Sequence, residues 1–127
     1  MSEMIKHQSF VKSVLRLQQV LRENKTDIVR DSSIKRYEIC YELAWKSIQE
    51  CLKNQGLEIC NSPKHCFKQA FKLGLIDDEE KFADMVHNRN LTTHIYDEAL
   101  ADKIYKQLHG YAQLLDELGK NIGHYQE

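Results

Sequence analysis

The chain has 127 residues, of which 42% are hydrophobic and 29% are charged, and its formal net charge at pH 7 is −1. This composition is typical of a folded globular protein and excludes an intrinsically disordered chain, and the lack of an apolar run of about 20 residues excludes a membrane-spanning helix. The near-zero charge argues against a protein that coats nucleic acid through a broad cationic surface, although it is compatible with a local site for one phosphate group.

The residue pattern is that of an all-α protein. The sequence contains one proline and five glycines, and it has no run of alternating Val, Ile or Thr residues that would predict a strand. We expect one domain over residues 1–127, folded as an up-and-down antiparallel bundle of four main helices and a short one. The first ten residues lack the apolar segment of a secretory signal, so we expect a cytoplasmic location.

Apolar residues at helical spacing predict a first helix over residues 2–23. Val11 and Leu15 are expected to widen its buried face. The polar segment 24–31 is expected to form the turn that follows. The central apolar stripe consists of Phe10, Val14, Leu17 and Leu21.

A second helix is predicted to end near Asn54, because apolar residues recur three and four apart, as in the seam of an antiparallel bundle. Gly56 suits the left-handed residue that ends such a helix. Tyr41 and Trp45 are interpreted as core residues, with a role in stacking on a ligand as the alternative. The candidate N-caps are Asp31, Ser32 and Ser33. The seam consists of Ile34, Tyr37, Tyr41, Ala44, Ile48 and Cys51.

Two shorter helices are predicted from their N-terminal signals. Ser62 is a candidate N-cap followed by a proline at the first helical position, and Gly74 is expected to end that helix. Asp77 and Asp78 are the candidate caps of the next helix. The apolar residues of the two helices are Phe67, Ala70, Phe71, Phe82, Met85 and Val86.

The last helix is predicted over residues 97–120, with Thr93 or Asp97 as its cap. The segment 121–127 is expected to fray at the end of the chain. The residues expected to face inward are Leu100, Ile104, Leu108, Tyr111, Leu115 and Leu118.

The four cysteines are too few and too scattered for a disulfide framework in a cytoplasmic chain, so we expect buried free thiols. Cys60, His65 and Cys66 lie close in the sequence, but no paired CxxC and no convincing fourth ligand accompany them. The sequence therefore predicts no metal site. The other two cysteines are Cys40 and Cys51.

Arg89 occupies the position after Val86 on the apolar stripe of the fourth helix. A guanidinium on a buried face is costly unless it meets an anion or hydrogen-bond acceptors. Arg89 is therefore interpreted either as a structural salt-bridge partner or as a functional group directed toward a cleft.

Arg89 also opens the motif Arg-x4-His-x-Tyr, which His94 and Tyr96 complete. A guanidinium, an imidazole and a phenol offered together form a candidate phosphate-handling site. On an unbroken helix Tyr96 would lie on nearly the same face as Arg89, whereas His94 would point about 140° away. A break in the weak helix-forming stretch 90–93, or assembly across a symmetric dimer, would remove this conflict.

The spacing alone also permits an interpretation without function. Arg89 would pair with a neighbouring carboxylate, His94 would be an interhelical histidine with satisfied hydrogen bonds, and Tyr96 would belong to the core. Short patterns of this kind occur by chance in many proteins.

Three blocks of the sequence resemble the nucleotidyltransferase substrate-binding protein family, which belongs to the HEPN group of small helical proteins. The blocks are RYEICYELAWKSIQECL, SPKHCFKQAFKLGLIDD and RNLTTHIYDEALADKIY, and they follow one another between residues 36 and 105. The resemblance implies a helical bundle that forms homodimers and works with a separate small nucleotidyltransferase, as in toxin–antitoxin pairs.

The resemblance also implies roles for the residues of the motif. In many HEPN proteins the arginine, the polar residue after it and the histidine form the active site of a metal-independent ribonuclease between two subunits. These roles would fall to Arg89, Asn90 and His94. In related pairs the tyrosine accepts AMP from the partner, and that role would fall to Tyr96. No cofactor is implied.

Two functions therefore remain open for the motif. In a ribonuclease, His94 would move protons and Arg89 would stabilise the phosphorane, so that the products would end in 2′,3′-cyclic phosphate. In a non-catalytic binding subunit, Arg89, His94 and Tyr96 would hold a nucleotide or the substrate of the nucleotidyltransferase. The chain lacks the Gly-Ser and paired-Asp pattern of the transferases, which excludes it as the transferase itself. A purely structural bundle is the third alternative.

Overall fold

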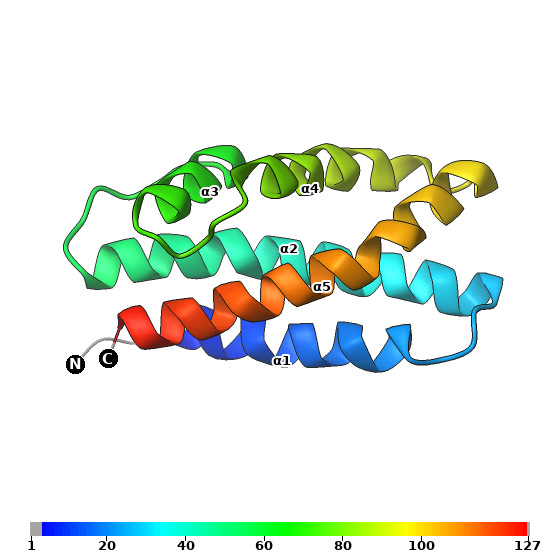
Figure 1. Cartoon of the computed structure of the whole chain (residues 1–127), viewed down its shortest axis with the longest axis horizontal. Coiled ribbons are helices and arrows are strands. Elements are labelled where there is room, and N and C mark those ends of the chain that lie inside the picture. Colours follow the sequence, from blue (N-terminus) through cyan, green and yellow to red (C-terminus); the bar gives the residue numbers. More distant parts are fainter. Residues whose placement is uncertain (1–3, 127) are drawn as a thin grey trace.

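The computed structural model describes residues 4–126, whose helices form an antiparallel bundle (Figure 1). The all-α, up-and-down architecture with one short helix beside longer ones is confirmed. Every helix in the described part of the chain is too short or too polar to cross a lipid bilayer. In chain order the helices are α1 Ile5–Leu21, α2 Asp27–Asn54, α3 Pro63–Lys72, α4 Glu79–Leu91, the 3-10 helix η1 Thr92–His94, and α5 Glu98–Tyr125.

The central helix of the bundle is α2. It packs against α1, while α5 crosses both helices diagonally on one side, and α3 and α4 follow one another along α2 (Figure 1). The junction between α4 and α5 consequently lies at the same end of the bundle as the turn between α1 and α2 (Figure 1).

Tyr37 joins three helices in the core. Its fully buried ring stacks on Tyr111 of α5 with 5.6 Å between the ring centroids. Its hydroxyl donates a 2.8 Å hydrogen bond to the backbone carbonyl of Met85 in α4. The core interpretation of Tyr41 is confirmed, because Tyr41 is buried edge-on against Phe67 of α3. Trp45 is partly buried against the same core.

The predicted start of α2 was wrong. The helix begins at Asp27, so most of the expected turn 24–31 is helical, and the cap is Thr26 rather than one of the three polar residues at 31–33. The Thr26 hydroxyl accepts a 3.0 Å hydrogen bond from the backbone N–H of Val29. The first turns of α2 lack an apolar stripe because their buried side chain is Arg30, a residue type that periodicity does not count as core.

Two predictions about the outer helices were also wrong. Val11 and Leu15 are 39% and 52% exposed, because they line an open hollow at the rim of the contact between α1 and α5. The helix α5 does not fray after residue 120 but continues to Tyr125, because Ile122 is fully buried and extends the apolar stripe. Residues 2–3 of the predicted first helix lie outside the described part of the chain.

The remaining helix boundaries follow the predicted signals. The Ser62 hydroxyl caps α3 and the Asp78 carboxylate caps α4, each by accepting a backbone N–H from the first turn. Gly56 and Gly74 have φ values of 69° and 76°, the left-handed conformation that ends a helix.

The cysteines divide into two kinds. Cys40 and Cys51 are buried free thiols, as predicted, and burial raises the pKa of each to about 11. The prediction was wrong for Cys60 and Cys66, which form a disulfide across a Cα–Cα distance of 5.0 Å. The loop after α2 folds back onto α3 so that Cys60 meets the first turns of that helix, a proximity that sequence spacing does not reveal.

We expect the double variant Cys60→Ser, Cys66→Ser to unfold at lower denaturant concentration than the wild type. A disulfide that closes so short a loop restricts the unfolded chain by about 2 kcal/mol, and chemical denaturation followed by circular dichroism measures the loss. The control is the same pair of proteins in reductant, where the difference should vanish. If thiol titration of the denatured wild type finds four free thiols instead of two, the disulfide is absent.

Candidate functional site at the junction of α4 and α5

The predicted break in the motif is present. The helix α4 ends at Leu91, the 3-10 turn of η1 follows, and α5 begins at Glu98. The buried Thr92 hydroxyl donates a 2.7 Å hydrogen bond to the Arg89 carbonyl, and the Asp97 carboxylate caps α5 by accepting the Leu100 N–H at 3.2 Å. Asp97 is thus the cap among the two predicted candidates.

Arg89 faces α2 from the last turn of α4. Its side chain is 26% exposed, and its Nη2 lies 3.7 Å from the Glu38 carboxylate. Its Nη1 donates a 3.1 Å hydrogen bond to the Thr92 hydroxyl. Its Nε is buried and meets no hydrogen-bond acceptor among the described residues. The interpretation of Arg89 as a salt-bridge partner is confirmed, and its two terminal nitrogens carry further N–H groups beyond those that face Thr92 and Glu38.

The charge of Arg89 also acts on two phenols of the core. Burial raises the pKa of Tyr41 to about 12; the charge of Glu42 adds to this effect and that of Arg89 opposes it. Burial likewise raises the pKa of Tyr37. Both phenols therefore stay protonated near neutral pH, and neither is a candidate proton donor or acceptor for the site.

His94 and Tyr96 form a pair on the surface. The His94 Nδ1 lies 3.0 Å from the Tyr96 hydroxyl oxygen, and the two rings meet edge-on with 5.7 Å between their centroids. His94 is exposed, and Tyr96 is 79% exposed. The interpretation of Tyr96 as a core residue is therefore wrong, and its phenol is accessible to a large reagent.

Within this one chain the motif is held by two separate sets of contacts. Arg89 contacts Thr92 and Glu38 of α2, whereas His94 and Tyr96 contact each other. Asn90 is exposed on the last turn of α4. The 3-10 turn changes the direction of the chain but leaves the arginine and the histidine with different partners.

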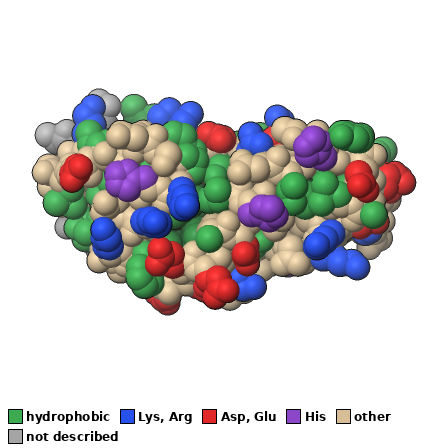
Figure 2. Space-filling view, turned by 90° about the horizontal axis from the view of Figure 1, so that it is seen from above, with side chains coloured by type: hydrophobic (Ala, Val, Ile, Leu, Met, Phe, Trp, Pro, Cys, Tyr) green, Lys and Arg blue, Asp and Glu red, His purple; other side chains and the backbone are tan. Residues whose placement is uncertain are grey.

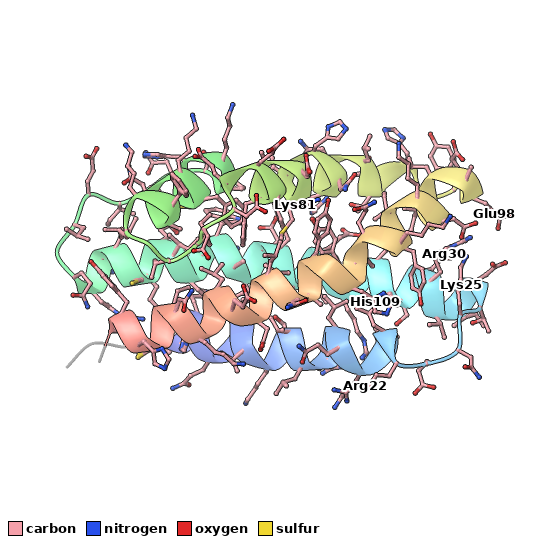
Figure 3. The ribbon with its side chains drawn as sticks, viewed as in Figure 1. Arg22, Lys25, Arg30, Lys81, Glu98 and His109 are labelled. Carbon is pink, nitrogen blue, oxygen red and sulfur yellow. A yellow bond between two sulfur atoms is a disulfide. The ribbon has the colours of Figure 1, made fainter. Side chains whose placement is uncertain are left out.

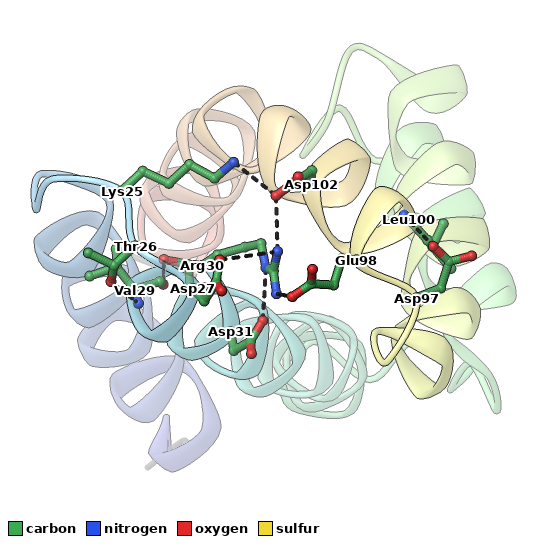
Figure 4. A network of polar contacts seen from close by, with 11 residues as sticks. Lys25, Thr26, Asp27, Val29, Arg30, Asp31, Asp97, Glu98, Leu100 and Asp102 are labelled. Atoms are coloured by element: carbon green, nitrogen blue, oxygen red, sulfur yellow. Dashed lines mark hydrogen bonds and ion pairs between the residues drawn. The ribbon is translucent and has the colours of Figure 1, made fainter.

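A buried guanidinium lies next to this junction. Arg30 in the first turns of α2 is 4% exposed and is surrounded by carboxylates of α2 and α5 (Figures 3 and 4). The distances are 3.0 Å to Asp31, 3.2 Å to Asp102, and 3.7 Å to both Asp27 and Glu98. Hydrogen bonds with Asp31 and Asp102 raise the pKa of Arg30. Hydrogen bonds from Lys25 and Arg30 hold the pKa of Asp102 below its usual range.

Sequence reasoning missed this network and the partner of Arg89. Arg30 fell in a segment interpreted as a turn, and Glu38 was one of many carboxylates on predicted helices. The signal that was present is indirect, since an arginine on a buried face requires an anion. Which carboxylate supplies it depends on how α2, α4 and α5 pack.

The profile of one protein family matches the chain over residues 5–123, which is nearly its whole length. That family is described as nucleotidyltransferase substrate binding protein like. The chain belongs to this family. The family's name implies a nucleotidyltransferase partner for its members.

Two known proteins resemble this family member. A probable ribonuclease HepT from Haemophilus influenzae is 30% identical over 89 residues, which are 64% of this chain and 61% of that protein. The match thus spans less than two thirds of the relative. A protein of Thermus thermophilus, known from its crystal structure, superimposes with a TM-score of 0.79 at 34% identity, and the match covers 91% of this chain and 98% of that one.

For this family member, we expect Asp102→Asn to lower the free energy of unfolding at neutral pH. Because the folded-state pKa of Asp102 lies below its ordinary value of 3.8, its contribution is complete above that value and is lost as the pH falls through the folded-state pKa. Urea unfolding at several pH values should therefore show the variant approaching the wild type in acid. Asp116→Asn is the control, since Asp116 forms the i,i+4 surface pair with Lys120. A difference between Asp102→Asn and wild type that stays constant down to about pH 2 would contradict the assignment.

Proposed function

We propose that this protein is a HEPN-type endoribonuclease that needs no metal ion and works with a small nucleotidyltransferase as a toxin–antitoxin pair. The observation that carries the proposal is the junction itself, which offers a partly exposed guanidinium and, beyond one 3-10 turn, an exposed imidazole paired with a phenol. The similarity to a probable ribonuclease supports it. In this proposal the protein is located in the cytoplasm and forms a homodimer, and each chain is a single HEPN-like domain.

The proposed cleavage is an internal transfer within the RNA. The ribose 2′-oxygen attacks the adjacent phosphorus while the bond from phosphorus to the 5′-oxygen breaks, and the products are a 2′,3′-cyclic phosphate and a free 5′-hydroxyl. His94 of one subunit accepts the proton of the 2′-hydroxyl, and the partner subunit's His94 donates a proton to the leaving oxygen. Arg89 donates hydrogen bonds to the charged phosphorane, and Asn90 contributes a neutral amide beside it.

The geometry of one chain supports the proposed dimer. Arg89 faces Glu38 and Thr92, while His94 faces Tyr96, so a single copy gives one phosphate no evident common position between the arginine and the histidine. A second copy placed with its junction against the first would bring in another arginine and another histidine. Two histidines are also what the paired acid and base steps require.

Tyr96 is the proposed site of regulation. Its accessible hydroxyl lies 3.0 Å from the Nδ1 of His94, which could accept the phenolic proton. Attack of the phenolate on the α-phosphorus of ATP would form a Tyr96–AMP ester and release pyrophosphate, with the partner nucleotidyltransferase as catalyst. The modification would remove the phenol from its hydrogen bond with His94, and across the proposed dimer the added phosphate would occupy the donors of the partner subunit's Arg89.

A non-catalytic subunit that binds a nucleotide or the transferase's substrate is the second candidate. The specific observation in its favour is the ion pair between Arg89 and Glu38, which holds the arginine apart from His94 within one chain. In that case the same three side chains would bind a phosphate group without moving a proton.

We expect the purified protein to cleave a mixed RNA pool in EDTA. His94→Ala should lower the rate by about 100-fold or more because a general acid and base is lost, and Arg89→Ala should do the same by removing charge stabilisation. Gel analysis with end-group mapping should find 2′,3′-cyclic phosphate. His87→Ala is the control, because His87 is an exposed histidine of α4 outside the motif. A dimer that leaves RNA intact would favour the binding subunit.

We expect incubation with the partner nucleotidyltransferase and ATP to add one AMP per chain, measured by intact mass. Tyr96→Phe should abolish the addition because it removes the nucleophilic hydroxyl while keeping the ring. Tyr125→Phe removes another exposed tyrosine and should leave the addition unchanged. Peptide mapping that places AMP on another residue would overturn the assignment to Tyr96.

A further inference from the structure

A row of cations follows the seam between α1 and α2 on the side away from α5. Two hollows of about 420 and 400 Å³ lie in this seam. We call them together the α1–α2 groove. The cations that line it are Lys6 and Arg16 of α1 and Lys35, Arg36, Lys46 and Lys53 of α2.

The periodicity of α2 separates the groove from the core. Tyr37 faces α5, where it stacks on Tyr111. Lys35 and Ile39, each two residues away, are turned about 200° along the helix from Tyr37 and lie on the opposite side. The distance along α2 from Lys35 to Lys53 is about 27 Å at 1.5 Å per residue, so the row extends over most of the helix.

The charge of the groove is almost uncompensated. Among residues 4–126, none of its six cations takes part in an ion pair. Glu50 is the carboxylate in its lining. Its two oxygens accept the backbone N–H groups of Lys6 and His7 at 2.9 and 3.2 Å, so Glu50 is committed to the start of α1. Six cations and one carboxylate therefore give the groove an excess of positive charge within a protein whose net charge is −1.

The basic face of α3 makes a useful comparison. Lys64, Lys68 and Lys72 recur every four residues and are exposed. The face formed by α3 and α4, however, mixes acidic and basic side chains (Figure 2). A concave surface lined by cations concentrates counter-charge better than a convex surface with mixed charges. The charge pattern therefore favours the α1–α2 groove as the site of a long anion.

The groove suits a nucleic acid strand more closely than a single phosphate. Cations spread over about 27 Å match a strand of several nucleotides, the scale of known single-strand grooves. Ile39 and Ile59 line it with 45% and 42% of their surfaces exposed, which offers apolar contact to unstacked bases. Glu38, the partner of Arg89, directly precedes Ile39 on α2 and is turned about 100° from it, so a strand that leaves the groove would have to pass around one side of α2 to reach the junction.

We propose that the α1–α2 groove binds the phosphodiester backbone of single-stranded RNA and thereby holds the substrate beside the Arg89–Tyr96 junction. The choice of RNA as the nucleic acid rests on the ribonuclease function proposed above. The charge and shape of the groove do not depend on that function. The row of cations would contact the phosphates of the strand, with no base-specific contact required.

The test is fluorescence anisotropy with a labelled single-stranded RNA of about 12 nucleotides, measured on the full chain carrying His94→Ala so that the probe stays intact. The triple variant Arg16→Gln, Lys35→Gln, Arg36→Gln should bind on the order of tenfold more weakly at low salt. It should also reduce the slope of log K against log salt by about 2, since each lost contact contributes about 0.7. The pair Lys46→Gln, Lys53→Gln should reduce the slope by about 1 and covers the case in which the triple variant misfolds.

The matched control is Lys64→Gln, Lys68→Gln, Lys72→Gln, which removes the same charge from α3 and should change the affinity less than twofold.

Equal losses in the control and groove variants, or unchanged binding in the folded groove variants, would overturn the proposal. So would a groove variant that changes only the oligomeric state in sedimentation, which would make this face a subunit interface. Groove-dependent binding without cleavage by the wild type would refute the ribonuclease and leave the groove in place. If the wild type cleaves RNA and the groove variants cleave it at the same rate, the ribonuclease function stands and the groove is refuted as the RNA-binding site.

Discussion

The burial of Arg30 constrains the end of the bundle that carries the motif. A guanidinium that is 4% exposed needs anionic partners, and it finds them on both α2 and α5. The start of α5 must therefore lie against the start of α2. Because Glu98 and Asp102 belong to the first turns of α5, the network fixes where the chain can go immediately after Tyr96.

The junction next to this network is shaped by competition between helix and side-chain hydrogen bonds. The Thr92 hydroxyl donates a hydrogen bond to the Arg89 carbonyl, and the Asp97 carboxylate caps α5. These bonds satisfy backbone groups freed where α4 ends and α5 begins. The chain thus changes direction between Arg89 and Tyr96 and presents an imidazole and a phenol to solvent, while the Arg89 guanidinium is partly buried against Glu38. This arrangement places titratable side chains at a helix end while the core around Tyr37 stays mainly apolar.

The parts of the fold that were predictable have local causes. The caps at Ser62 and Asp78, the left-handed glycines, and the break within the motif each depend on a few neighbouring residues. The errors have non-local causes. Val11 and Leu15 have the spacing of core residues but lie at the open rim of the contact between α1 and α5, and Cys60 meets Cys66 only because a loop folds back. The extension of α5 depends on a buried place for Ile122.

The sequence by itself determined the helical class, most helix ends, the family resemblance, and the residues of the motif, because periodicity, caps and motif spacing are properties of adjacent residues. The tertiary structure decided which charges meet. It paired Arg89 with Glu38, enclosed Arg30 among carboxylates of two helices, exposed Tyr96, and gathered six cations of α1 and α2 around two hollows along one seam. The physical reason is that the energy of a charge depends on its burial and on the distance to its partners, and both are set only when distant helices pack.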